Sequence, residues 1–532
     1  MTVRGAALAL TTFVSGAVLL GLELAASRVL SPAFGNSLFV WGALIGVVLT
    51  GLSVGYWAGG VLADRLPSAR LLLGSVFVGG MFVLAVPLVD DRVLAFVERW
   101  DPGPRADPLV AATILFAPPS VVLATVTPIA VRLASRELAF AGRTAGRLFS
   151  VSTAGSIAGT FATAFWLVPA LGVDQLLAAG AAALLVASLP LALAHRAWPF
   201  AGVGAGLAGL AVVAAVSLAP DRGGTVSAAE LRNYSPVYRS RAELLRSAPD
   251  PVSTGFRVLD RRDTRYHHLL VVEDADTRYL RFDNSFQSAM ELAHPYRAHF
   301  TYTAALDLGL AYRTSAKRVL FVGLGAGSAP KRMRRDFPGI DVRVVEIDPD
   351  VVKVARKWFA FPRTIPVVTE DGRRFLERSD ERYDVIAIDA YYADAIPFHL
   401  TTREFLETVR SRLQPGGVVV SNVIGSVRGE GSKLLRSFVR TYREVFPTVA
   451  LHPVYSRGDD AFTIANSILV ASTGAAPDKG ALRTRWHALR ARHPLAPHLD
   501  RVIDGRYDGD IPVNDVPTLV DDYAPTDALL VE

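Results

Sequence analysis

The first 220 residues consist of long apolar segments separated by short polar ones. Seven runs of about 20 apolar residues carry almost no charge, and each is long enough to cross a bilayer as a helix. The first run contains Glu23 and has six more behind it, so we interpret it as an uncleaved helix rather than a signal peptide. We expect residues 1–220 to form a transmembrane domain of about seven helices, near 6–27, 37–60, 70–89, 108–132, 147–171, 174–194 and 199–219.

The pattern changes after residue 220. Residues 221–252 are polar and contain Arg-Gly-Gly and Ser-Pro, so we interpret them as a linker. Within 253–300, two alternating runs flank the turn 274–276, which is typical of a β-hairpin, and we expect a β-hairpin substrate subdomain. From 301 to 475 strand and helix patterns alternate, as in a mostly parallel sheet covered by helices. Residues 476–532 are a mixed carboxy-terminal extension.

The region 301–475 contains buried strand patterns, and the first of them ends in a glycine-rich turn. Gly323, Gly325 and Gly327 allow a sharp turn that brings backbone amides close to a ligand, ahead of a predicted helix. Glu346 ends the next strand, where a carboxylate can accept both hydroxyls of a ribose; capping of a turn is the structural alternative. Strands are predicted near 318–323, 342–347, 365–369, 383–389 and 416–423.

Carboxylates also follow the third and fourth of these strands. Asp371 can accept a hydrogen bond from an adenine amine, and Gly372 allows close approach, although an ordinary turn is the alternative. Asp389 ends the fourth strand. Ligands of open α/β sheets bind beyond the carboxyl ends of the strands, so Gly323, Glu346, Asp371 and Asp389 should converge. We therefore predict an α/β Rossmann-like domain of the S-adenosylmethionine methyltransferase type; a dinucleotide-binding fold shares only the glycine loop and the first acid.

Composition adds few constraints. The net charge of +6 could suggest nucleic acid, but the arginines are scattered and many flank apolar runs, where they report topology. We expect no nucleic-acid partner. The absence of cysteine excludes disulfides and thiolate metal sites. The histidine pairs 294/299 and 267/268 lack the spacing of metal ligands, so we expect no metal.

Charge and helix count disagree about topology. Two positively charged loops should be cytoplasmic, which places the amino terminus inside. Seven spans would then place the carboxy-terminal part outside, whereas a cofactor made in the cytosol favours the inside. We expect a multi-pass protein of the cell membrane with a cytoplasmic catalytic domain. Three explanations of the conflict stay open: the number of spans differs by one, the charge rule does not hold for this chain, or the carboxy-terminal domain faces outward. The charges are Arg65 and Arg70 in one loop and Arg132, Arg136, Arg143 and Arg147 in the other.

The run 256–475 resembles spermidine synthase, that is, the polyamine aminopropyltransferases. The amino-terminal half looks like that of the membrane-fused bacterial branch of this family, and its segment 55–65 is also similar to a loop of major-facilitator transporters. The resemblance rests on the stretches 265–269, 282–288, 319–327, 345–348, 371–372 and 389–397, and for the membrane-fused branch on 399–405 and 521–525.

The resemblance implies transfer of an aminopropyl group from decarboxylated S-adenosylmethionine to a polyamine, with release of methylthioadenosine. It implies that Glu346 holds the ribose, that Asp371 holds the adenine, and that Asp389 orients and deprotonates the amine. It also assigns a cofactor contact to Pro397. The expected partners are a small amine and the lipid bilayer, and a homodimer stays open. The implied substrate contacts are Tyr266, His267, Gln287, Tyr302, Tyr391, Tyr392 and Asp394.

The chain departs from the family pattern in four places. Ala326 replaces an aspartate of the glycine loop, Tyr392 replaces the second acid of the catalytic loop, and His267 replaces a glutamine. Tyr302-Thr303 replaces a Tyr-His pair. Without an acid at 326, S-adenosylmethionine itself stays open as the donor, and so does an acceptor other than a diamine. Two alternatives follow: a methyltransferase or other S-adenosylmethionine-consuming enzyme, and a non-catalytic nucleoside-sensing domain on a transporter-like protein.

Overall fold

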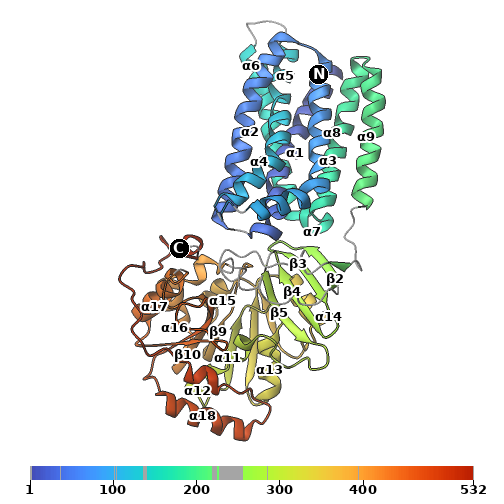
Figure 1. The fold of residues 1–532 in the computed structure, drawn as a ribbon. Coiled ribbons are helices and arrows are strands. Elements are labelled where there is room, and N and C mark those ends of the chain that lie inside the picture. Colours follow the sequence, from blue (N-terminus) through green and yellow to red (C-terminus); the bar gives the residue numbers. More distant parts are fainter. Residues whose placement is uncertain are drawn as a thin grey trace. The chain divides into compact units, whose positions relative to one another are not determined.

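A computed structural model describes most of the chain. The described residues are 3–35, 37–100, 102–103, 105–135, 141–217, 225–226, 256–283, 285–393, 395–429 and 431–530. They belong to two compact units, shown in Figure 1. The first unit comprises Met1–Arg222 with Arg261–His268, and the second comprises Gly223–Asp260 with Leu269–Glu532.

Long apolar helices make up most of the first unit (Figure 1). By length and composition, six helical stretches of the described chain are suited to cross a membrane. The seventh predicted run corresponds to α9, whose apolar stretch Trp198–Ala214 is shorter than the other six. The helices are α1 (Val3–Phe34), α2 (Leu38–Arg65), α3 (Ala69–Trp100), α4 (Asp107–Ala124), α5 (Val126–Ala134), α6 (Ala141–Ala162), η2 (Thr163–Leu167), α7 (Val168–Leu171), α8 (Val173–Ala194) and α9 (Trp198–Ser217).

Small residues let α1 and α6 pack with their backbones close together. A Cβ atom added at Gly155 would lie 2.0 Å from the carbonyl oxygen of Phe13, and one added at Gly159 would lie 2.1 Å from that of Ala17. Any larger residue would push the two helices apart. Such packing is common between helices in lipid, where no hydrophobic effect holds them together.

A five-stranded sheet precedes the larger sheet in the chain. Its strands are hydrogen-bonded in sequence order. The predicted hairpin corresponds to β3 and β4, and Asp274 accepts the backbone N–H of Thr277 at 2.7 Å in the turn between them. Of the predicted linker 221–252, only β1 lies among the described residues. The strands are β1 (Thr225–Val226), β2 (Phe256–Asp263), β3 (His268–Glu273), β4 (Thr277–Phe282) and β5 (Ser285–Glu291).

The second unit is built around a seven-stranded mixed sheet. Its order is β11-β12-β10-β9-β6-β7-β8, parallel from β10 to β8 and antiparallel where β12 pairs with β10 and β11. The five predicted strands coincide with β6–β10, whereas β11 and β12 were not predicted. The strands are β6 (Arg318–Val322), β7 (Asp341–Glu346), β8 (Val367–Thr369), β9 (Tyr383–Ile388), β10 (Leu413–Gly425), β11 (Thr448–Pro453) and β12 (Ala465–Ser472).

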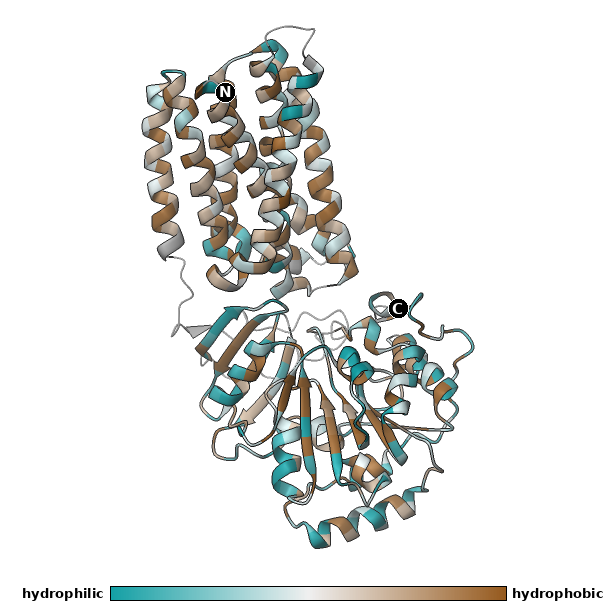
Figure 2. Ribbon diagram, turned by 180° about the vertical axis from the view of Figure 1, so that it is seen from behind, coloured by the Kyte–Doolittle hydropathy of each residue, from teal (hydrophilic) through white to brown (hydrophobic). Residues whose placement is uncertain are grey.

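Both faces of this sheet are covered by helices. Val319 and Phe321 of β6 join a core with α12, α13, α14 and α18, whereas Leu320 and Val322 join a second core with α15, α16 and α17. Burial on both faces explains why the central strands are continuous apolar runs, which are brown in Figure 2. The helices are α11 (Thr301–Ala305), α12 (Leu308–Tyr312), α13 (Ser328–Asp336), α14 (Pro349–Trp358), α15 (Gly372–Arg378), η4 (Phe398–Leu400), α16 (Arg403–Ser411), α17 (Lys433–Val445), α18 (Lys479–Arg492), α19 (Asp500–Asp504) and α20 (Thr526–Leu530).

The direction of strand addition reverses at β6. The chain adds β7 and then β8 on one side of β6, and then returns to place β9 on the other side. This arrangement creates a switch point between β6 and β9, where open α/β sheets bind their ligands. Gly323 follows β6 and Asp389 follows β9, so the topology itself brings these two predicted site residues together.

Candidate active site

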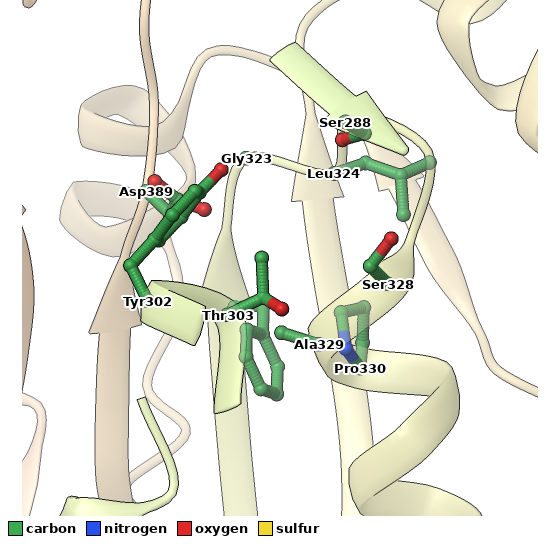
Figure 3. A pocket seen from close by; sticks show the side chains of 10 residues that line it. Ser288, Tyr302, Thr303, Gly323, Leu324, Ser328, Ala329, Pro330 and Asp389 are labelled. Carbon is green, nitrogen blue, oxygen red and sulfur yellow. The ribbon is translucent and has the colours of Figure 1, made fainter. Parts of the chain in front are cut away.

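A pocket opens at the switch point, beyond the ends of β6 and β9 (Figure 3). It encloses about 270 Å³ of empty space, part of which is open to solvent. Asp389 is the single charged side chain among the residues that line it. The lining residues are Ser288, Tyr302, Thr303, Phe321, Gly323, Leu324, Ser328, Ala329, Pro330 and Asp389.

The glycine loop connects β6 to α13 along one wall of this pocket. Gly323, Gly325 and Gly327 have φ angles of 96°, 52° and 72°, a left-handed conformation that side chains disfavour. At Gly323, a Cβ atom would lie 2.2 Å from the carbonyl oxygen of Asp389. The loop is thus pressed against the end of β9. Ser288 of β5 secures the loop from the other side, because its Oγ accepts the backbone N–H of Ala326 at 3.1 Å.

Glu346 joins the glycine loop to the end of β7. One carboxylate oxygen accepts the backbone N–H of Leu324 and the other accepts that of Asp348, both at 2.9 Å. The side chain is buried, with 7% of the residue exposed. These two contacts fix the carboxylate at the end of β7, next to the glycine loop.

Asp371 caps the amino terminus of α15. Its Oδ1 accepts the backbone N–H of Arg374 at 2.9 Å, and its Oδ2 lies 2.8 Å from Nε2 of His399. Burial alone would raise the pKa of Asp371, but the hydrogen bonds from His399 and Arg374 outweigh it and hold the pKa below its ordinary value. Gly372 has a packing role as well, because a Cβ atom there would lie 2.4 Å from Val322.

Asp389 is held at the end of β9 by two hydrogen bonds. Its backbone N–H donates to the carbonyl of Val322 at 2.9 Å, and its Oδ1 accepts the side-chain amide of Asn422 at 3.0 Å. Burial raises the pKa of Asp389 to about 6, although the Asn422 hydrogen bond opposes the shift. The result is a carboxylate that is more basic than usual and still mostly ionised at neutral pH.

Gln287 and Tyr302 connect three elements around the pocket. The amide of Gln287 donates to the carbonyl of Ala393 at 2.8 Å, and the Tyr302 hydroxyl donates to the carbonyl of Gln287 at 3.2 Å. Ala393 lies in the loop after β9 and has a φ of 51°, unusual for a residue with a side chain. β5, α11 and this loop are therefore tied together beside Asp389.

The other predicted substrate residues, and the predicted cofactor contact Pro397, are placed differently. The Tyr391 hydroxyl donates to the carbonyl of Asn422 at 3.0 Å, Tyr392 forms a backbone bridge with Ala395, and Pro397 precedes η4. None of these three lines the pocket. Asp394 lies outside the described residues. Tyr266 and His267 lie in the turn before β3, where both backbone N–H groups donate to Thr264 Oγ1, and this turn clusters with the helical unit.

Several residues at the site were not predicted from the sequence to be site residues. Thr303 and Ser328 line the pocket, Asn422 contacts Asp389, and His399 contacts Asp371. Asn422 carries a recognisable signal, because it interrupts the apolar run of β10 and is buried with 4% exposure. His399 gives no such signal. Among the described residues, no group of three or more acidic or histidine side chains is arranged to hold a metal.

Comparisons with known proteins agree with this geometry. Residues 299–467 match the spermine/spermidine synthase domain. The chain is 29% identical over 265 residues to a polyamine aminopropyltransferase of Vibrio vulnificus, covering 48% of this chain and 85% of that protein. It is also 29% identical over 220 residues to the N-terminal histidine N-methyltransferase of Emericella nidulans, covering 37% of this chain and 38% of that protein.

A solved structure, a probable spermidine synthase from Corynebacterium glutamicum, is 21% identical with a TM-score of 0.38, covering 48% of this chain and 99% of that one. The match of residues 299–467 to the spermine/spermidine synthase domain and the aminopropyltransferase relatives indicate that the protein is a transferase.

Proposed function

We propose that the protein is a membrane-bound aminopropyltransferase. It would move an aminopropyl group from decarboxylated S-adenosylmethionine to a polyamine or a related amine, and release methylthioadenosine. One observation carries this proposal: a half-buried carboxylate, Asp389, faces a pocket at the switch point of the region that matches the spermine/spermidine synthase domain. The printed name of the Vibrio vulnificus relative supports the polyamine acceptor.

The proposed reaction is a direct displacement. The amine nitrogen forms a bond to the propyl carbon next to the sulfonium, the carbon–sulfur bond breaks, and its electron pair leaves on the sulfur of methylthioadenosine. The acceptor begins as an ammonium ion with a pKa of about 10 and is not nucleophilic until it loses a proton. Asp389 can attract that cation and receive the proton. Because no covalent intermediate is needed, alignment of the two substrates contributes much of the acceleration.

The nucleoside would lie against the glycine loop. Glu346, at the end of β7, would accept the ribose hydroxyls, and Asp371, at the amino terminus of α15, would accept the adenine amine. Gly323 brings the loop close to Asp389, which would place the sulfonium near the carboxylate.

Methyl transfer from S-adenosylmethionine is a second candidate. The similarity to an N-methyltransferase favours it, and so does the neutral side chain of Ala326 in the glycine loop. The donor pocket would be the same, but the bond broken would join the sulfur to its methyl group, and the nucleoside product would be S-adenosylhomocysteine.

The nucleoside product separates the two candidates. Full-length protein in detergent would be supplied with each donor and a mixture of amines, and the nucleosides identified by mass spectrometry. Methylthioadenosine that appears only when an amine is present supports the proposal. S-adenosylhomocysteine would assign the protein to methyl transfer, and intact donor in every mixture would contradict both.

We also propose that the protein is a multi-pass protein of the cell membrane with its catalytic domain in the cytoplasm. The six long apolar helices support membrane insertion. An even number of crossings, with the positively charged loops inside, would return the chain to the cytoplasmic side, where an S-adenosyl donor is made.

A further inference from the structure

Asp389 stands at one end of a hydrogen-bonded series of side chains. The series continues through the amide of Asn422 on β10 to the amide of Asn466 on β12. Asn422 of β10 donates from Nδ2 to Asp389 Oδ1 at 3.0 Å. Asn466 of β12 donates from Nδ2 to Asn422 Oδ1 at 3.1 Å. β10 and β12 are antiparallel, and Asn466 pairs with Ile424, two residues beyond Asn422, so the two amides lie on the same face of the sheet.

The two contacts of Asn422 determine which way its amide faces. An ionised carboxylate can only accept hydrogen bonds, so it requires the NH₂ group of Asn422 rather than the oxygen. Asn466 supplies the matching donor to that oxygen. A flipped Asn422 would place an oxygen against the carboxylate and an NH₂ group against the NH₂ group of Asn466. Both contacts would be lost, so the carboxylate fixes the orientation of Asn422, and the donor of Asn466 matches that orientation.

The backbone beside Asn422 is fixed as well. The Tyr391 hydroxyl donates to the carbonyl of Asn422 at 3.0 Å and accepts the backbone N–H of Ile424 at 3.2 Å. Tyr391 follows Asp389 by two residues, so the segment that bears the carboxylate is attached to β10 at two points. Asn422 is buried, and its side chain is therefore confined to this arrangement.

We propose that Asn422, oriented by Asn466, is a positioning residue that aims the Asp389 carboxylate at the acceptor amine and keeps it ionised at neutral pH. This inference rests on the proposed role of Asp389 as the proton acceptor. It assigns to Asn422 and Asn466 a function that neither the domain match nor the pocket lining indicates.

The hydrogen bond from Asn422 matters for the pKa of Asp389 because the other side chains around the carboxyl are neutral. Burial raises the pKa of the Asp389 carboxyl. No cation is among the residues that line the pocket with it. The polar side chains there are Tyr302 and Thr303 of α11, Ser288 of β5 and Ser328 of α13. All four bear neutral hydroxyls. A hydrogen bond to a charged group is strong enough to move a pKa by about one to two units when it is lost.

Asn422→Asp is the sharpest test, because it replaces the donor with a carboxylate of the same size. Two carboxylates in contact cannot both ionise easily, so one pKa rises strongly. We expect the acidic limb of the kcat–pH profile to move up by at least about one pH unit, with little change in the affinity for methylthioadenosine. Asn466→Ala, which removes only the orienting donor, should move the limb in the same direction by a smaller amount.

Two controls separate this inference from the proposed function. Asn514→Asp makes the same chemical change at an exposed position and should leave the profile in place. Asp389→Asn tests the base itself. If Asp389→Asn abolishes turnover while both amide variants keep the wild-type profile, the inference is wrong and the proposed function stands. If Asp389→Asn turns over normally, both the inference and the proposed role of Asp389 as the base are wrong. If Asn422→Asp does not fold, an unmoved limb in Asn466→Ala overturns the inference.

Discussion

A carboxylate that must accept a proton from an ammonium ion works best when its own pKa is high and it is nevertheless ionised. Asp389 meets both conditions, because burial raises its pKa to about 6, within reach of neutral pH. A pKa at that level leaves most of the carboxyl groups ionised at pH 7. Asp371 is shifted in the opposite direction by its hydrogen bonds, as suits an acid that holds a ligand rather than a proton.

The first prediction at this scale concerns the charge of Asp389. Asp389→Asn keeps the shape of the side chain, and its oxygen can still accept the Asn422 amide, but it cannot accept a proton. We expect kcat to fall by about 10² or more, while methylthioadenosine binds as before in a calorimetric titration. Asp380→Asn, at a fully exposed carboxyl, is the matched control and should keep wild-type turnover. An unchanged kcat in Asp389→Asn would show that Asp389 is not the proton acceptor.

The second prediction concerns pH. Because the pKa of Asp389 is raised to about 6, the ionised base is present above that pH and is lost as the pH falls through it. We expect kcat, measured with both substrates saturating, to decline by about tenfold for each pH unit below that point. Activity that stays level down to the ordinary range of an aspartate, near pH 4, would show that this group does not limit turnover.

At the scale of elements, the site depends on how closely the loop after β6 passes the end of β9. The loop and the end of β9 approach each other closely at Gly323. A side chain there would be strained by the positive φ angle and would collide with the carbonyl of Asp389. The glycine loop is therefore packed directly against the end of β9 beside the pocket. A change in the loop should affect nucleoside binding and the position of Asp389 together.

Gly323→Ala tests this arrangement. The left-handed backbone and the 2.2 Å approach predict a cost of at least about 1–3 kcal/mol, which the loop can relieve only by moving. We expect the affinity for methylthioadenosine to drop by about tenfold or more. Gly339→Ala lies in a turn with open space around it and should bind normally. Wild-type affinity in Gly323→Ala would contradict the close-packed loop.

Burial on both faces made the central strands of the larger sheet recognisable from the sequence. Runs such as 319–322 and 383–388 are apolar because both faces of the sheet are covered, so their pattern identifies a strand without knowledge of its partners. β11 lacked that signal. His452 interrupts it, and this histidine is tolerated because Tyr312 and the carbonyl of Val502, far away in the chain, satisfy both ring nitrogens.

The contacts within the site could also be predicted only in part from the sequence. Gly323 and Asp389 could be predicted to meet, because strand ends of a parallel sheet share one edge. The contacts of Gln287 and Tyr391 could not, because their partners are backbone carbonyls of Ala393 and Asn422. Carbonyl groups occur at every residue, so the sequence carries no sign of which one a side chain will reach.

At the scale of the whole molecule, a transferase domain is joined to long apolar helices. The helices are suited to lipid by length and composition, and the chain has no cysteine. Single cysteines introduced into this background can therefore be labelled without interference, which makes the topology directly measurable.

We predict that Asp380→Cys in the catalytic domain and Ser68→Cys between α2 and α3 will both resist a membrane-impermeant thiol reagent in intact cells. Both should react once the membrane is permeabilised, because the positively charged loops and the catalytic domain are proposed to share the cytoplasmic side. Ala106→Cys, before α4, should react in intact cells and is the control for outward exposure. Labelling of Asp380→Cys in intact cells would place the catalytic domain outside and require seven crossings.

The central claim is that the protein breaks the bond between the sulfonium and the propyl carbon of its donor. The most direct measurement uses decarboxylated S-adenosylmethionine and S-adenosylmethionine, each labelled with one isotope in the propyl chain and another in the S-methyl group, with an amine acceptor. The account predicts that the propyl label from the decarboxylated donor enters the amine while the methyl label stays on methylthioadenosine. Methyl label in the acceptor, with the propyl chain left on the nucleoside, would contradict it.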